Sequence, residues 1–354
     1  MNNTGSNTLP PPTDRGSFAA TVPIPAVDVT TRDVVTRVTQ SAQLSVERDL
    51  HKLQFRAMST HCQVNCHGAS AETVREFQRE AVVWVAEFEA RYSRFIPDSL
   101  IGRINAAAGE RWVETDPETD RLFNLCHELV FITRGAFDPT ALPLIRLWDW
   151  KRRPSAIPED EAIQAARALV GWRKVQRRPG GIFLPQRGMA IDLGGIGKEY
   201  AVDCVMSMAI QRGIPNVLVD FGQDVRVRGH APGKRCWWIG LDDPAHPGQC
   251  WTGVAVTNHG VATSGDYLRN FGYNGRRYGH ILDPRTGYPA YNDCRAVSII
   301  APTCTLAGLL STSACVLGAK EGLQLVELQP GAAGAVTTDS AKHYSRTFHE
   351  YIPV

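Results

Sequence analysis

Short β-branched segments dominate the second half of the chain, and they constrain its fold more than any other feature. From Gly171 onward, brief apolar runs are bounded by glycine, proline or aspartate, which predicts strands joined by tight turns. The expected strands are GIFLPQ, MAIDL, NVLVDF, DVRVRG, CWWIGL, WTGVAVT, RRYGHIL and CRAVSIIAP. Two segments with helical spacing interrupt them, GKEYAVDCVMSMAIQRG and TLAGLLSTSACVLGAKEGLQLVEL, and each is expected to form a helix.

The first half of the chain predicts mainly helices after one hairpin. The stretch from His51 to Gly68 alternates as a strand or hairpin does, and Ser70 is placed to cap a long amphipathic helix. Further helices are expected in PDSLIGRINAAAG, in PETDRLFNLCHELVFITRG and in the segment ending at Leu169. Long helices beside antiparallel-looking strands predict an α+β protein.

The ends of the chain and its charge limit the class of protein. Residues 1–47 are rich in Pro, Thr, Ser and Asn without a periodic apolar face, so a disordered extension is expected there, with the folded domain over 48–354. No secretory signal pattern and no long apolar run is present, which predicts a cytoplasmic protein without a membrane span. A net charge of +2 argues against a general nucleic-acid binder. Nine scattered cysteines without a CxxC pair indicate neither a zinc knuckle nor a disulfide framework.

A glycine-rich turn in IDLGGIGKEYAVD, from Ile191 to Asp203, is the first candidate site. A strand is expected to end at Asp192 and a helix to begin near Lys198. Such a turn directs backbone amides toward an anion at the helix N-terminus, and the lysine adds positive charge, which suits a phosphate or pyrophosphate. A plain strand-to-helix turn would have a similar sequence.

Two further segments are ambiguous by themselves. VATSGDYLRNF is expected to connect two strands, where its polar side chains would satisfy local amides. In GAFDPTALPLIRLWDW, Gly135 ends a helix and Asp138-Pro139 opens a turn. Trp148 and Trp150 are then expected in a loop or short strand, as core residues rather than stacking platforms for a ligand.

The segment YGHILDPRTGYPA contains a histidine that its turn does not explain. Asp283-Pro284 and Thr286-Gly287 are turn dipeptides, because proline fixes φ and glycine accepts positive φ. His280 at the end of the preceding strand could help to hold this turn, or it could take part in catalysis.

Taken together and in this order, these segments resemble the ApbE family, the magnesium-dependent FAD:protein FMN transferases. The resemblance spans about Phe55 to Leu325 and is carried by AMST, YSRFIPDSLIGRIN, GAFDPTALPLIRLW, IDLGGIGKEYAVD, TSGDYLRNF and HILDPRTGYP. It implies an ApbE-like fold over 48–354, with a mixed or antiparallel β-sheet core and packed helices. It also implies cleavage of the FAD pyrophosphate, transfer of FMN to a Thr or Ser hydroxyl of an acceptor flavoprotein, and release of AMP.

The resemblance also assigns roles to individual residues. His280 becomes the base that takes the proton of the acceptor hydroxyl, a task that an imidazole with a pKa of about 6.5 suits at neutral pH. The FAD site is expected to contain Met58, Phe95, Ala136, Phe137, Asp138, Asp192, Lys198, Thr263, Ser264, Gly265 and Asp266. Phe95 stands where the family usually has a tyrosine, so stacking is kept and a hydroxyl is lost.

In the family, three ligands from the protein form the magnesium site: a carboxylate in a late helix, a hydroxyl four residues after it, and a backbone carbonyl of the glycine-rich turn. This chain departs from that pattern. Here Thr312 and Gly195 correspond to the last two, but Gly308 replaces the carboxylate. Magnesium binds mainly through carboxylates and water, so its affinity should be weak unless another acid compensates. The candidates for compensation are Asp192, Asp266 and Asp283.

The glycine at 308 leaves other functions open. A catalytically weak FAD-binding homologue that stores flavin or regulates a partner is one alternative, and an FAD pyrophosphatase that releases FMN and AMP is another. Gly308→Asp is expected to raise magnesium affinity without harming its helix, because glycine is itself a poor helix residue.

Overall fold

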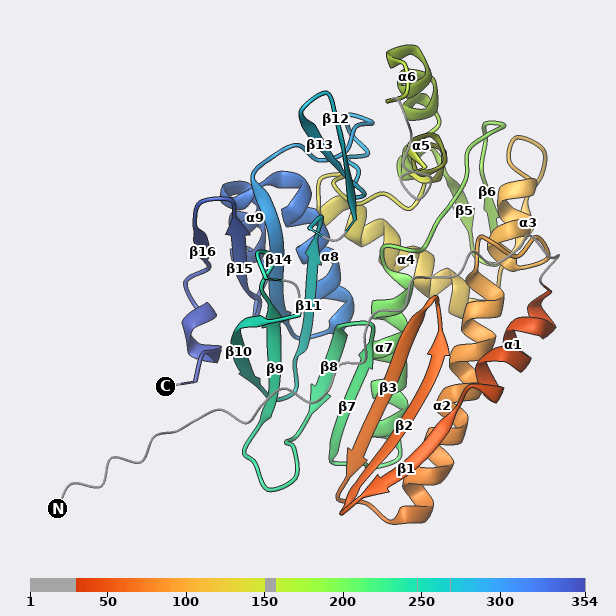
Figure 1. The fold of residues 1–354 in the computed structure, drawn as a ribbon. Coiled ribbons are helices and arrows are strands. Elements are labelled where there is room, and N and C mark those ends of the chain that lie inside the picture. The colour runs from red at the N-terminus through yellow and green to blue at the C-terminus, as the bar shows by residue number, and fades with distance from the viewer. Residues whose placement is uncertain (1–29, 150–156, 247, 268, 354) are drawn as a thin grey trace.

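In the computed structural model, the described residues are 30–149, 157–246, 248–267 and 269–353. They build a nine-stranded sheet (Figure 1). In spatial order its strands are β1 (Gln43–Glu47), β2 (Leu50–Ala57), β3 (Thr60–His67), β7 (Asn216–Phe221), β8 (Asp224–Arg228), β11 (Gly260–Gly265), β14 (Cys294–Ala301), β15 (Ala333–Thr338) and β16 (Lys342–Tyr344). Neighbouring strands are antiparallel throughout this sheet, and the predicted α+β class is confirmed.

The helices of the described residues are α1 (Thr31–Gln40), α2 (Ala71–Tyr92), α3 (Leu100–Ala106), α4 (Pro117–Ile132), α5 (Leu142–Trp148), α6 (Asp160–Ala168), α7 (Gly197–Gln211), α8 (Cys304–Leu317) and α9 (Ala319–Glu327). Of these, α1, α2, α7, α8 and α9 pack on strands of this sheet. The two-residue period of a strand separates the faces of β14. Val297 and Ile299 pack with the core under α8 and α9, whereas Ile300 packs with the opposite core.

Smaller sheets complete the fold. They are the hairpin of β9 (Trp237–Asp242) and β10 (Cys250–Val256), the hairpin of β12 (Asn270–Tyr273) and β13 (Arg276–Gly279), and a sheet of β4 (Val113–Glu114), β6 (Gly181–Phe183) and β5 (Gln176–Arg178). The β9–β10 hairpin and a 3₁₀ turn at Phe348–Tyr351 cover the face of the main sheet that α8 and α9 leave open.

The N-terminal boundary differs from the prediction. Residues 31–47 form α1 and β1, and Thr30 begins the helix with a capping box that includes Asp33. Val34 and Val38, four positions apart, are 3% and 0% exposed, and α1 packs on α2. The prediction of disorder is therefore wrong from Thr30 onward, because two buried valines suffice to hold a short helix against α2. Residues 1–29 lie outside the described residues.

Some predicted strands, helices and loops differ in the structure because their backbone makes contacts with residues distant in the sequence. MAIDL forms no strand, because Asn105 binds its backbone instead: the Asn105 amide accepts from Ile191 N at 2.7 Å and donates to Ile191 O at 3.0 Å. The late helix is two helices, α8 and α9, separated at Gly318, whose φ of 84° leaves the helical region. Thr263, Ser264 and Gly265 belong to strand β11 instead of a connecting loop.

Other local predictions hold or fail in part. Ser70 caps α2 as expected, and its side chain accepts from Thr73 N. Trp148 is a core residue with 2% exposure, as predicted, but it ends helix α5 instead of lying in a loop or strand. Trp150 lies outside the described residues.

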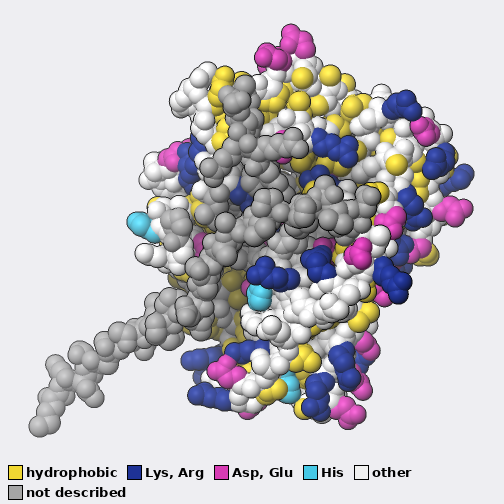
Figure 2. All heavy atoms as spheres, turned by 45° about the vertical axis from the view of Figure 1, so that its right-hand side comes forward, with side chains coloured by type: hydrophobic (Ala, Val, Ile, Leu, Met, Phe, Trp, Pro, Cys, Tyr) yellow, Lys and Arg dark blue, Asp and Glu magenta, His cyan; other side chains and the backbone are white. Residues whose placement is uncertain are grey.

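On the face of the molecule shown in Figure 2, basic and acidic side chains lie among one another instead of gathering by sign. Among the helices of the described residues, none is long and apolar enough to cross a membrane.

Candidate active site

The glycine-rich turn is held rigidly at Asp192. The Asp192 backbone donates to Pro139 O at 2.8 Å, and its carboxylate accepts from Gly194 N at 3.0 Å. The Arg94 guanidinium lies 3.1 Å from the same carboxylate. Helix α7 then begins with Ile196 at its N-cap and no side-chain cap. The first N–H groups of α7 are thus not capped by a side chain, an arrangement that favours an anion at this end.

Lys198 in the first turn of α7 forms an ion pair with Asp224 at the start of β8. Burial lowers the pKa of Lys198, but the carboxylates of Asp224 and Glu199 outweigh this effect and raise the pKa above its ordinary value. Lys198 is therefore a cation, and Asp224 neutralises it in this structure.

Strand β11 brings the predicted residue Ser264 into contact with the predicted residue Thr312 of α8. Ser264 Oγ lies 2.9 Å from Thr312 Oγ1 and 2.7 Å from Ser311 Oγ. Thr263 Oγ1 lies 2.8 Å from Ser298 Oγ on the neighbouring strand. Gly265 ends β11, and Asp266, just beyond it, pairs with Arg277 at 2.8 Å. The polar end of β11 is thus in direct contact with the middle of α8.

His280 follows β13, and the turn after it is held by other residues. The Asp283 carboxylate accepts from Arg285 Nε at 2.9 Å and Nη2 at 2.8 Å, and Gly287 N donates to Asp283 O at 2.8 Å. His280 itself is half-buried, with Nδ1 3.3 Å from Arg269 O. Burial, together with the charge of Arg269, lowers the pKa of His280 to about 4. The imidazole is therefore neutral at neutral pH and able to accept a proton.

The other predicted FAD residues lie on separate loops. Met58 lies in the β2–β3 turn at φ 49° and donates its N–H to Glu89 at 2.8 Å. Phe95 is 65% exposed, and the Arg94 guanidinium carbon lies over its ring, 4.3 Å from the ring centroid. Ala136 and Phe137 are buried. The Asp138 carboxylate accepts from Trp172 N at 2.9 Å and from Thr140 N at 2.8 Å, so it ties two loops together.

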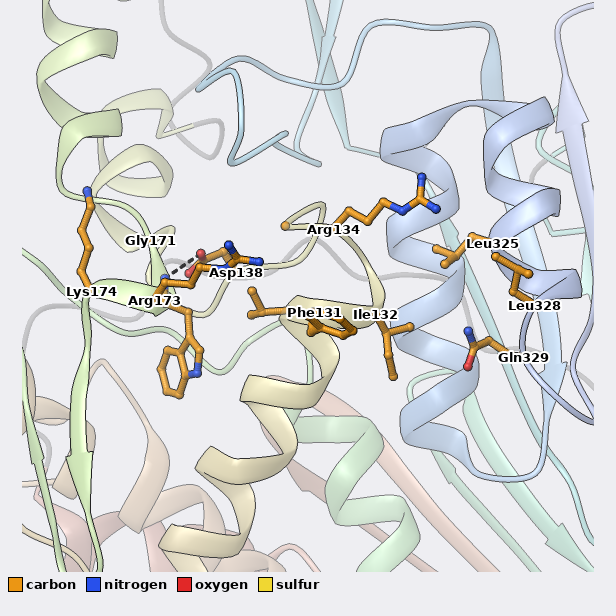
Figure 3. A pocket seen from close by; sticks show the side chains of 13 residues that line it. Phe131, Ile132, Arg134, Asp138, Gly171, Arg173, Lys174, Leu325, Leu328 and Gln329 are labelled. Atoms are coloured by element: carbon orange, nitrogen blue, oxygen red, sulfur yellow. Dashed lines mark hydrogen bonds between the residues drawn. The ribbon is translucent and has the colours of Figure 1, made fainter.

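A pocket of about 850 Å³ lies beside this site, between the end of α4, the 171–174 segment and α9 (Figure 3). Its wall combines exposed Phe131 and Leu328 with Arg134, Arg173 and Lys174. Of the predicted site residues, it includes Asp138 but not His280, Lys198 or Ser264. The candidate site is therefore defined by its side chains and not by this pocket.

Comparison with known proteins identifies the family. The family model for ApbE matches residues 58–336, which is more than half of the chain.

This chain belongs to the ApbE family.

Relatives and solved structures agree with this assignment. The chain is 31% identical to the FAD:protein FMN transferase of Treponema pallidum, over 78% of this chain and 79% of that protein. It is 28% identical to the one of Haemophilus influenzae, over 79% and 84%. The crystal structure of the ApbE protein from Thermotoga maritima superposes with a TM-score of 0.78 at 31% identity, covering 86% of this chain and 100% of that chain. The flavin transferase ApbE from Vibrio cholerae superposes with a TM-score of 0.76 at 25% identity, over 88% and 100%. The predicted family and fold are both confirmed.

Gly308, the departure from the ApbE pattern, faces the side chain of Glu199. A Cβ built on Gly308 would lie 2.5 Å from Glu199 Cγ and 3.0 Å from Glu199 Oε1. The reason is the packing of α7 against α8: the Asp203 carboxylate accepts from Cys304 N and Thr305 N, each at 2.9 Å. Whether Gly308→Asp leaves the helix unharmed stays a prediction, and the Glu199 side chain would have to shift to make room for the aspartate.

Glu199 is a residue that the sequence reasoning missed. It is 7% exposed, and its Oε2 has no hydrogen-bond partner among the described residues. Burial, with the neighbouring charge of Asp224, raises the pKa of Glu199 to about 7, although Lys198 opposes the shift. Helical spacing could have indicated it, since Glu199 shares a face with the buried Val202 and Met206.

The three acids expected to compensate for Gly308 are each paired with an arginine. Asp192 lies 3.1 Å from Arg94 Nε, and Asp266 lies 2.8 Å from Arg277 Nη2. Asp283 makes the bidentate contact with Arg285 described above. Each carboxylate has a cation beside it, which lowers its capacity to serve as the anionic ligand of a metal ion.

The contact at Gly308 makes a prediction about stability. Replacing a helix-interior glycine by alanine ordinarily stabilises a helix by about 0.8–1 kcal/mol. We expect Gly308→Ala to destabilise the protein instead, by about 1–3 kcal/mol, because the added methyl group overpacks the contact with Glu199. Urea unfolding followed by circular dichroism measures the change. Gly197→Ala is the matched control, since its Cβ would meet no atom nearer than 3.9 Å. A stabilised Gly308→Ala protein would show that Glu199 moves aside freely.

The environment of His280 makes a prediction about protonation. We expect its ring to be half protonated near pH 4, because burial and Arg269 disfavour the imidazolium. The ring should thus stay neutral as the pH falls through 6.5 and gain its proton only in more acidic solution. NMR titration of protein with labelled histidine measures this, with the His280 signal assigned from a His280→Gln spectrum. A midpoint near 6.5 would contradict a desolvated environment for the ring.

Proposed function

We propose that this protein is an FAD:protein FMN transferase, which cleaves the FAD pyrophosphate, attaches FMN to a Thr or Ser hydroxyl of an acceptor protein and releases AMP. The observation that carries the proposal is the placement of His280 beside a turn that Asp283 and Arg285 hold without it, in a chain whose helix α7 begins without a side-chain cap. Membership of the ApbE family, with relatives named for this activity, supports it.

Each group of residues has a role in this reaction. The amides at the start of α7 bind the pyrophosphate, and Lys198 contributes to this site by exchanging its partner Asp224 for the anion. His280 takes the proton of the acceptor hydroxyl as its oxygen forms the new bond to the phosphorus of the FMN half, and the bond to AMP breaks. The exposed ring of Phe95 offers a stacking surface for the flavin. The remaining predicted residues, Met58, Ala136, Phe137, Asp138, Asp192 and Thr263 to Asp266, form the surrounding walls of the FAD site.

Magnesium, when bound, neutralises charge on the reacting phosphate. The Thr312 hydroxyl and the Gly195 carbonyl are oxygen donors of the kind that a hard cation takes. Both donors are uncharged, so they fit the ion only in combination with a carboxylate.

The acceptor is a second protein that presents a Thr or Ser in an exposed segment, where the active site can reach its hydroxyl. A cytoplasmic location and the unity of residues 48–354 as one flavin transferase domain remain predictions from the sequence.

The decisive test is incubation of the full chain with FAD, magnesium and an acceptor flavoprotein domain, followed by mass spectrometry of the proteins and chromatography of the nucleotides. We expect an acceptor heavier by one FMN together with an equal amount of AMP. Release of FMN and AMP without a modified acceptor would indicate a pyrophosphatase instead. Tight FAD binding with neither product would indicate a homologue that stores flavin or regulates a partner.

A further inference from the structure

We propose that Glu199 supplies the anionic metal ligand that Gly308 cannot, so that the carboxylate of the cation site comes from α7 instead of α8. The inference rests on the proposed function for the identity of the ion, magnesium. It concerns this chain's own departure from the family pattern.

The first argument is that Glu199 and a side chain at position 308 exclude one another. The carboxylate oxygen Oε1 lies 3.0 Å from the place where the Cβ of residue 308 would be, and Cγ lies 2.5 Å from it. A carboxylate oxygen is thus present close to the space that an aspartate at 308 would fill. The glycine at 308 makes room for Glu199.

The second argument is the cost of the buried carboxylate. Glu199 is 7% exposed, and no described residue offers Oε2 a hydrogen bond. Its neighbour Lys198 forms its ion pair with Asp224 instead. A buried carboxylate with an oxygen that accepts no hydrogen bond is unfavourable, and a bound cation at that oxygen offsets this cost. Asp192, Asp266 and Asp283 already have arginine partners and lack this unmet requirement.

The third argument is the placement of the uncharged donors. Thr312 lies four residues after Gly308 and so on the same face of α8, where Ser264 contacts it at 2.9 Å. Gly195 lies four residues before Glu199, in the turn that leads into α7. Asp203 fixes these two helices against each other through the N–H groups of Cys304 and Thr305. The carboxylate, the hydroxyl and the carbonyl therefore belong to facing elements.

The test is metal binding by the full chain without FAD, with Mn²⁺ as the probe ion and electron paramagnetic resonance as the readout. We expect wild-type protein to bind Mn²⁺ and Glu199→Gln to lose more than the roughly 10–100-fold in affinity that groups beyond the ligands themselves contribute. The matched control is Glu87→Gln on the exposed face of α2, which should bind as the wild type does. Equal Mn²⁺ affinity in Glu199→Gln and wild type, or no binding by the wild type, would overturn the proposal.

A reciprocal exchange of the two residues distinguishes the loss of a metal ligand from a folding defect in Glu199→Gln. The double variant Glu199→Gly with Gly308→Asp moves the carboxylate to α8 and removes the steric conflict. Recovery of Mn²⁺ binding relative to Glu199→Gly alone supports the proposal, and failure to recover it in a folded double variant contradicts it. Since FAD and acceptor are absent, this outcome is separate from the proposed function. A protein that binds Mn²⁺ through Glu199 but transfers no FMN would refute only the function.

Discussion

We expect His280→Ala to slow FMN transfer by about 10²–10⁴-fold, the usual effect of losing a general base. The affinity for FAD should change little, because the proposed pyrophosphate contacts are at the start of α7. The neighbouring turn should remain folded, since Asp283 and Arg285 hold it without the histidine. Single-turnover transfer to an acceptor domain measures the rate, and calorimetry measures FAD binding.

The matched control for this prediction is His343→Ala, which removes an exposed histidine from strand β16. It should transfer FMN at the wild-type rate. If His280→Ala also retained full transfer, another group would have to accept the proton, and the role of His280 would be confined to local structure.

The second large effect concerns stability. Asp203 accepts from two N–H groups at the start of α8 and forms an ion pair with Arg226 at 2.8 Å. Its side chain is 14% exposed and that of Arg226 is 19% exposed. Asp203→Ala leaves Arg226 without this partner and leaves the N–H groups of Cys304 and Thr305 without their acceptor, although Thr303 still caps α8, so we expect a loss of about 3–5 kcal/mol in the free energy of unfolding.

Denaturant unfolding followed by circular dichroism measures this loss. Ser70→Ala is the comparison, because Ser70 caps α2 through the single N–H of Thr73 and its loss should cost about 1 kcal/mol. A loss no larger than that of Ser70→Ala would show that Asp203 acts only as a helix cap. In that event, the contact between α7 and α8 would depend on apolar packing alone.

Several features could be predicted from the sequence because they depend only on neighbouring residues. The cap at Ser70, the turn at Asp283 and the alternation along β14 each depend on residues a few positions apart, whose geometry follows from backbone preferences. The order of the motifs was sufficient to predict the family and the antiparallel core. It also singled out His280, although not the environment that lowers its pKa.

Features that depend on contacts between residues distant in the chain became apparent only in the tertiary structure. MAIDL has the composition of a strand, but Asn105 binds its backbone, and among the described residues no strand pairs with it. Residues 31–40 lack a broad apolar face, yet α2 buries Val34 and Val38. Above all, the sequence shows Gly308 only as the loss of a carboxylate, whereas the fold shows the Glu199 side chain filling the space beside it. Steric exclusion and burial act through space, and no spacing along the chain reports that α7 and α8 meet at these two residues.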